Sequence, residues 1–114
     1  MEVVKFVEAP LYNAPDHEDV VARRLQGGEA SGTEFALVGH SYFRAGAVVP
    51  MSAGDIGKVY VVTGGALTIE QADGVVHVLH PLDSIYIAAG EARAIRNESG
   101  APAAMIVITP PARV

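Results

Sequence analysis

The chain has 114 residues, of which half are hydrophobic and 18% are charged, and its formal net charge at pH 7 is −5. A domain of this size buries roughly 60–70% of the surface that its unfolded chain exposes, which leaves almost no room for a second domain. The apolar content argues against disorder. The negative charge argues against a nucleic-acid partner, because binding to the phosphate backbone depends on Lys and Arg. No cysteine is present, which excludes disulfides, thiolate nucleophiles and Cys-type zinc sites.

The N-terminal residues carry acids at Glu2 and Glu8 and contain no apolar stretch as long as that of a secretory signal. No run in the chain approaches the roughly 20 apolar residues of a membrane-spanning helix. We therefore expect a cytoplasmic protein without a membrane partner.

Residues 1–33 predict N-terminal strands and loops. Residues 3–7 are a short β-branched run that predicts an opening strand, followed by turn-forming residues. Residues 16–28 are ambiguous. Early acids, late arginines and two closing glycines match a helix, whereas residues 20–25 can alternate as a strand.

From residue 34 onward the pattern favours strands. Residues 34–44 form a long apolar and aromatic run, within which Gly39 predicts a bend or bulge. Turn signals then recur at short intervals and separate segments rich in Val, Ile and Tyr. These segments are residues 58–63, 66–71, 75–79, 84–88, 92–97 and 104–109. Many short strands with little room for helix predict an all-β sandwich or barrel, formed as a single domain over residues 1–114.

Two glycine-punctuated stretches resemble the two motifs of the cupin superfamily, and in particular of its small single-domain barrels. In the first stretch, Gly46 opens and Gly65 closes the motif at the family's spacing, and residues 59–65 are similar to the family's strand and turn. The second motif resembles residues 83–90, which lead on to residues 93–97.

This resemblance covers residues 35–109 and implies the family's fold. That fold is the double-stranded β-helix, a jelly-roll barrel, with the conserved barrel over residues 34–109. The resemblance also favours a strand at residues 20–25 and implies association as a homodimer.

The resemblance breaks down at the positions where cupins bind their metal. Ser52 and Gly54 stand where the family has its two motif-one histidines, Lys58 stands where it has a glutamate, and Arg93 stands where motif two has a histidine. A divalent ion needs neutral imidazoles and carboxylates as ligands, and two cations would repel it. We therefore expect neither a metal at this position nor a cofactor, which weighs against the dioxygenase and metal-dependent isomerase activities of the family's enzymes.

If the family's inward-facing positions carry over, Lys58, Tyr60, Arg93 and Asn97 face the barrel interior. Two cations, a phenol and an amide suit a small anionic or carbonyl-bearing ligand. A Lys beside an Arg has its pKa lowered, so it can serve as a base or as an imine-forming nucleophile. We take Lys58, Tyr60 and Arg93 as candidate catalytic residues and Asn97 as a candidate substrate-binding residue.

Alternatively, the two cations Lys58 and Arg93 have a structural role and bind no ligand. Lys58 then pairs with a carboxylate of Asp55, Asp83 or Glu91, and Arg93 closes the barrel mouth with its stem packed and its head in water.

The histidines offer further candidates. His40, Tyr42 and Arg44 share one strand face, so they either line the pocket as substrate-binding residues or lie on the outer face. His77 and His80 are three residues apart and point to opposite faces of a strand, which weakens a shared role and favours surface or loop positions for both.

Three functions follow from these residues. The leading hypothesis is a metal-independent cupin that binds a small molecule, with isomerase, cyclase or lyase chemistry because proton transfer needs only a base and an oxyanion partner. The second is a non-catalytic binding or sensing module. The third is a metal oxygenase that uses His40 with His77 or His80.

Overall fold

The computed structural model describes residues 1–14 and 16–111. Its strands form two antiparallel sheets. The first sheet contains, in spatial order, β1 (Leu11–Tyr12), β2 (Val20–Gln26), β3 (Leu37–Phe43), β10 (Ala103–Thr109), β5 (Lys58–Gly64) and β8 (Ser84–Ile87). The second sheet contains β4 (Val48–Ala53), β9 (Ala92–Arg96), β6 (Leu67–Gln71) and β7 (Val76–Leu79). A 3₁₀ turn, η1 (Phe6–Glu8), precedes them.

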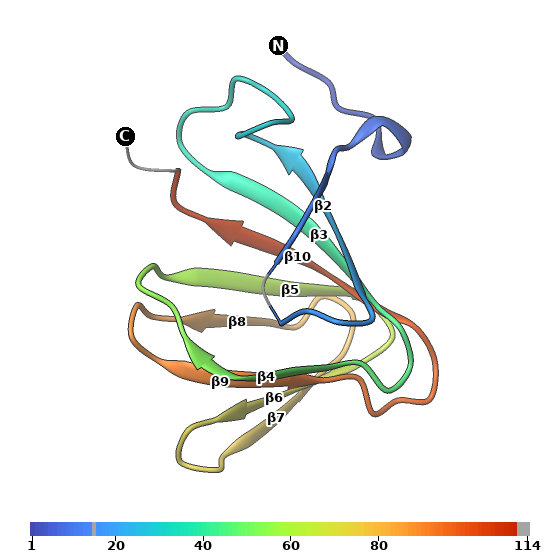
Figure 1. The fold of residues 1–114 in the computed structure, drawn as a ribbon, viewed down its shortest axis with the longest axis vertical. Helices are drawn as coiled ribbons and strands as arrows, with labels where there is room; N and C mark the ends of the chain where they lie inside the picture. The colour runs from blue at the N-terminus through green and yellow to red at the C-terminus, as the bar shows by residue number, and fades with distance from the viewer. Residues whose placement is uncertain (15, 112–114) are drawn as a thin grey trace.

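The all-β jelly-roll expectation is confirmed. Strands distant in sequence lie side by side, since β10 pairs with both β3 and β5, and β4 pairs with β9. In Figure 1 the strands from β2 to β8 descend through the first sheet, and the second sheet lies below them. Within the described residues, no helix is long and apolar enough to cross a membrane.

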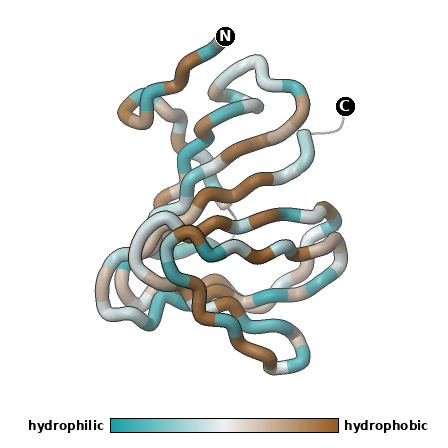
Figure 2. The backbone as a smooth tube through the Cα atoms, turned by 180° about the vertical axis from the view of Figure 1, so that it is seen from behind, coloured by the Kyte–Doolittle hydropathy of each residue, from teal (hydrophilic) through white to brown (hydrophobic). Residues whose placement is uncertain are grey.

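The core lies between the inner faces of the two sheets. Its most deeply buried apolar side chains are Phe43, Val49, Val62, Leu67, Ile69, Ile95 and Met105. Figure 2 shows the matching pattern, with hydrophobic stretches along the strands and hydrophilic ones at many of the turns. Because side chains alternate across a strand, the core positions of β5 and β9 place Tyr60 and Arg93 on the same inner faces.

A glycine closes the turn after β5 for two reasons. Gly65 has a φ of 65°, and a Cβ at this position would lie 2.6 Å from the carbonyl oxygen of Pro102. The turn therefore requires a residue that adopts the left-handed region and lacks a side chain.

The N-terminal third resolves one ambiguity and corrects one expectation. Residues 20–25 form a strand, as the family resemblance favoured, but residues 3–7 do not form one. This segment is held by side chains instead of a sheet ladder. The ring of Phe6 packs edge-on against His40, and Arg23 donates to the carbonyl of Ala9 at 2.8 Å.

Gly39 predicted a bend or bulge in β3. The pairing of β3 with β10 is continuous, but its pairing with β2 has an irregularity opposite Gly39, where the extra residue lies on β2 between Arg24 and Gln26. The glycine is explained by close packing, because a Cβ there would lie 2.9 Å from the hydroxyl oxygen of Tyr12.

Candidate functional site

A cavity of about 340 Å³ lies between the sheets, with β8 on one side and β6, β7 and β9 on the other. Its size is within the range of about 300–1,000 Å³ that is usual for small-molecule sites. The apolar residues of the lining are Ile69, Leu79, Ile85, Ile87 and Ala92, and the polar ones are Gln71, His77, Ser84, Tyr86, Glu91 and Arg93. Tyr86 alternates with Ile85 and Ile87 along β8 and is 68% exposed, so its side chain lies on the outer face of that strand.

Arg93 is the cation of this lining, and it is only 7% exposed. Its Nε donates to the hydroxyl of Tyr60 on the facing sheet at 2.9 Å, and its Nη1 donates to Oγ of Ser52 at 3.2 Å. Ser52 is the direct cross-strand partner of Arg93, which explains the second bond. Among the described residues, no carboxylate lies within ion-pairing distance of this guanidinium.

Tyr60 lies behind Arg93 and is 2% exposed. Burial raises the pKa of its phenol, although the charge and the hydrogen bond of Arg93 oppose the rise. The hydroxyl therefore stays neutral and serves as an acceptor for the guanidinium.

Lys58 is half-buried beside Arg93. Burial lowers the pKa of its ammonium, and the charge of Arg93 lowers it further. Its Nζ lies close to Gly54, where an added Cβ would approach to 3.1 Å.

The structural alternative for Lys58 required an ion pair, and none is formed with the described carboxylates. Asp83 instead accepts from the backbone N–H of His80 at 2.9 Å, and Glu91 accepts from that of Ala88 at 3.0 Å.

The four positions that the resemblance aligns with the cupin metal ligands therefore lie together. Ser52 bonds to Arg93, Gly54 adjoins Lys58, and Lys58 experiences the charge of Arg93. A hydroxyl, an ammonium and a guanidinium do not form a set of ligands for a divalent cation. Elsewhere in residues 1–14 and 16–111, no group of three or more His, Asp or Glu side chains is arranged to hold a metal.

The three candidate histidines lie at separate places. His77 lines the cavity, where its Nε2 lies 2.6 Å from Oε1 of Gln71. His80 lies in the turn after β7, with its side chain 68% exposed and 3.9 Å from Asp83. His40 packs against Phe6, so the structure does not bring His40 to either of the others.

The cavity position of His77 differs from the surface or loop position expected from the sequence. The sequence contained a signal for this position. His77 and Leu79 are two residues apart and therefore share one face of β7, and Leu79 is buried.

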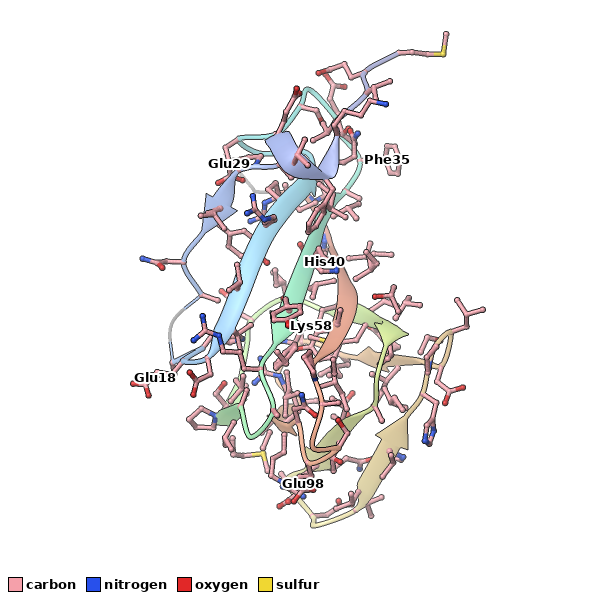
Figure 3. All side chains as sticks on the ribbon, turned by 90° about the vertical axis from the view of Figure 1, so that its right-hand side faces the viewer. Glu18, Glu29, Phe35, His40, Lys58 and Glu98 are labelled. Carbon is pink, nitrogen blue, oxygen red and sulfur yellow. The ribbon has the colours of Figure 1, made fainter. Side chains whose placement is uncertain are left out.

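The four candidate substrate-binding residues lie outside the cavity lining. Tyr42 is 39% exposed, and Arg44 is exposed and lies 3.9 Å from Asp19. Asn97 is buried, but its Nδ2 donates to the carbonyls of Phe43, Arg44 and Ala101, and its Oδ1 accepts from the N–H and hydroxyl of Ser99. In Figure 3 His40 lies along β3, beneath the N-terminal turn. The structure thus brings Lys58, Tyr60 and Arg93 together and leaves His40, Tyr42, Arg44 and Asn97 elsewhere. Of the first three, Arg93 lines the cavity, Tyr60 and Lys58 lie next to it, and Lys58 also borders a groove on the first sheet.

Comparison with known proteins gives a relative that matches most of the chain. The chain is 39% identical over 107 residues to a protein of Mycobacterium tuberculosis named beta-D-galactosidase Rv1717, and the match covers 94% of this chain and 91% of the relative. No family model matches the chain.

Solved structures share the fold. The polyketide cyclase RemF from Streptomyces resistomycificus superposes with a TM-score of 0.86 at 17% identity, over 99% of this chain and 81% of that one. A sugar phosphate isomerase from a cupin superfamily, from Silicibacter pomeroyi, superposes with a TM-score of 0.80 at 20% identity, over 97% of this chain and 76% of that one. At these identities the likeness is one of fold, and the shared fold is the two-sheet jelly roll.

Proposed function

We propose that this chain, which has the fold of the cupin-superfamily structures named above, binds a small organic anion or carbonyl compound in its barrel at Arg93, with Lys58 and Tyr60 beside it. The observation that carries the proposal is a buried guanidinium without a carboxylate partner among the described residues. A buried charge is costly unless it is compensated. Hydrogen bonds to Tyr60 and Ser52 leave other N–H donors of Arg93 for a ligand.

The same residues support proton-transfer chemistry without a metal. A lysine with a lowered pKa is a better base at neutral pH than an ordinary lysine. Arg93 would stabilise an oxyanion that develops on the ligand, and Tyr60 holds Arg93 in place. Isomerisation, cyclisation or a lyase reaction at a carbon next to a carbonyl group fits this arrangement.

Calorimetric binding of matched acids and amides tests the anion site. Benzoate and pyruvate should bind at least about tenfold more tightly than their amides, since a hydrogen bond to a charged group contributes about 1.5–3 kcal/mol. Lys58→Met should weaken binding of the acids, whereas Arg44→Met, which removes an exposed cation outside the cavity, should not. Equal affinities for acids and amides would refute the proposal.

Deuterium exchange separates an enzyme from a binding module. For a bound ligand with hydrogens next to a carbonyl group, such as pyruvate, proton abstraction in D2O replaces those hydrogens with deuterium, which NMR detects. Exchange that is lost in Lys58→Met supports the enzyme. Saturable binding without exchange or conversion supports the non-catalytic alternative.

Hydrolysis of a β-D-galactoside is a second candidate, favoured by the name of the relative that is 39% identical. Most glycosidases use two carboxyl groups across the scissile bond. Among the described residues that line the cavity, Glu91 is the one carboxylate. Release of nitrophenol from nitrophenyl β-D-galactoside by the wild type, with loss in Glu91→Gln, would favour this candidate over proton transfer.

We also propose a homodimer through the outer side of the first sheet. A groove of about 470 Å³ there is lined largely by apolar residues, including the exposed side chains of Phe35, Tyr86 and Ile108. Phe35 projects away from the body of the protein in Figure 3. Contiguous apolar surface of this kind is typical of an interface. Sedimentation should give a dimer that Phe35→Ser with Tyr86→Ser converts to a monomer, and a monomeric wild type would contradict the proposal.

A further inference from the structure

A polar strip crosses the wall of the cavity formed by the second sheet. Ser52, Arg93 and Gln71 are successive cross-strand neighbours on β4, β9 and β6. Their Cβ atoms are therefore expected to lie about 4.5–5.5 Å apart from one strand to the next. His77 on β7 extends the strip through its contact with Gln71. A cation and a histidine thus line one cavity on either side of a glutamine.

The amide of Gln71 determines which nitrogen of His77 carries a proton. Its Nε2 donates to Oδ1 of Asp73 at 3.4 Å, so its Oε1 is the atom that faces His77. Asp73 is itself held, because the same oxygen accepts from the N–H of Val75 at 3.0 Å. A carbonyl oxygen only accepts, so the proton of the 2.6 Å contact lies on Nε2 of His77. In the neutral ring, Nδ1 is then left as an acceptor.

The lining therefore offers two kinds of recognition. Arg93 has N–H donors for an anion, and Nδ1 of His77 is left as an acceptor for a hydroxyl proton. Glu91, which also lines the cavity, adds a second acceptor for hydroxyl groups. The apolar side chains of Ile69, Leu79 and Ile87 provide a surface against which a ring can pack.

We infer that the ligand is a hydroxylated carboxylate of about one ring in size, with its carboxylate on Arg93 and a hydroxyl group donating to Nδ1 of His77. This inference rests on the proposed anion site. It adds the substrate class and assigns a binding role to His77, with Gln71 and Asp73 as positioning residues.

Calorimetry with three ring-sized probes tests the substrate class. D-galacturonate has both the carboxylate and the hydroxyls, D-galactose lacks the carboxylate, and cyclohexanecarboxylate lacks the hydroxyls. D-galacturonate should bind about tenfold or more tightly than either of the others, since each lacks one set of hydrogen bonds.

The outcomes separate this inference from the function on which it rests. Equal binding of cyclohexanecarboxylate and D-galacturonate overturns the hydroxyl site and leaves the anion site standing. Equal binding of D-galactose and D-galacturonate overturns the anion site and this inference with it. Failure of all three to bind overturns the substrate class, while the benzoate and pyruvate measurements decide the anion site independently.

A histidine variant tests the role of His77. His77→Phe keeps an aromatic ring but removes one of the two acceptors, so the preference for D-galacturonate over cyclohexanecarboxylate should fall by at least about threefold. Retained binding of cyclohexanecarboxylate shows that the variant is folded. The matched control, His80→Phe, changes an exposed histidine outside the cavity and should keep the preference. An unchanged preference in His77→Phe overturns the inference.

The tautomer can be measured directly by ¹⁵N NMR of the imidazole rings. The wild type should show a proton on Nε2 of His77, and Gln71→Leu should lose this preference because the accepting oxygen is gone. A proton found on Nδ1 instead, in the neutral ring of the wild type, overturns the assignment of Nδ1 as the acceptor.

Discussion

The guanidinium of Arg93 donates from its Nε to the hydroxyl of Tyr60 across the space between the two sheets, at 2.9 Å. Arg93 belongs to β9 and Tyr60 to β5, and both side chains are buried. One contact therefore connects the facing sheets and orients the cation that lines the cavity. Barrel stability and ligand recognition depend on the same pair.

Tyr60→Phe should lower the free energy of unfolding by about 1–3 kcal/mol, because it leaves a buried, charged N–H donor without its acceptor. Urea denaturation measures the loss. Tyr86→Phe is the matched control, since this hydroxyl belongs to a side chain that is 68% exposed, and it should stay within about 0.5 kcal/mol of the wild type. Equal stability of the two variants would show that the bond to Arg93 contributes nothing.

Lys58→Met should remove an alkaline rise in stability. The pKa of Lys58 is lowered in the folded state by burial and by Arg93. Between the folded pKa and the ordinary value of 10.5, the unfolded chain binds more protons, so the free energy of unfolding rises with pH in that window. The variant should be more stable than the wild type below the folded pKa, and this difference should shrink as pH rises towards 10.5.

Urea denaturation between neutral pH and pH 10.5 measures this difference. The control is Lys5→Met, which changes an exposed lysine of the N-terminal segment. Parallel pH curves for the wild type and Lys58→Met would contradict the electrostatic account.

Asn97→Ala should destabilise the protein by about 3 kcal/mol, since three backbone carbonyls lose a shared buried donor. Asn13→Ala, at an exposed position, is the comparison. Binding of benzoate by the folded fraction should be unchanged, because Asn97 does not line the cavity. Normal stability with lost binding would instead support the substrate-binding role that the sequence predicted.

The metal content of the purified protein tests whether the barrel binds a metal when Ser52, Gly54, Lys58 and Arg93 occupy the ligand positions. Protein purified without added metal should contain no stoichiometric Fe, Mn, Ni or Zn. Restoring the family's pattern with Ser52→His, Gly54→His, Lys58→Glu and Arg93→His should create Zn²⁺ binding, since neutral imidazoles and a carboxylate then replace two cations. Gly54 has no positive φ, and the atom nearest to an added Cβ belongs to Lys58, which the design removes.

Stoichiometric metal in the wild type would contradict the proposal of metal-independent chemistry. Folded protein of the fourfold variant without Zn²⁺ affinity would show that these positions do not form a ligand set in this barrel.

Much of the fold could be predicted from the sequence because strand periodicity and turn residues are local properties. The alternation along residues 58–63 and 92–97 placed Tyr60 and Arg93 each on a definite face of its strand, and the recurring turns predicted a sandwich or barrel. The jelly-roll order of the strands was implied by the resemblance to cupins. The loss of the metal ligands was also readable, since the chemical nature of Lys58 and Arg93 does not depend on their surroundings. The prediction of an opening strand at residues 3–7 was wrong. The N-terminal segment is held by side-chain contacts of Phe6 and Arg23 with residues distant in the sequence, and a local pattern does not show such contacts.

Only the tertiary structure decided which polar groups meet. Alternation assigns a residue to a face of a strand, but it does not give distances between sheets. The partners of Arg93 are Tyr60 and Ser52, 33 and 41 residues away along the chain. The same folding that joined them moved His77 into the cavity, left His40 against Phe6 and enclosed Asn97 among backbone carbonyls. The sequence by itself determined the barrel and the identity of its polar residues, and long-range packing of the two sheets selected those that line the cavity.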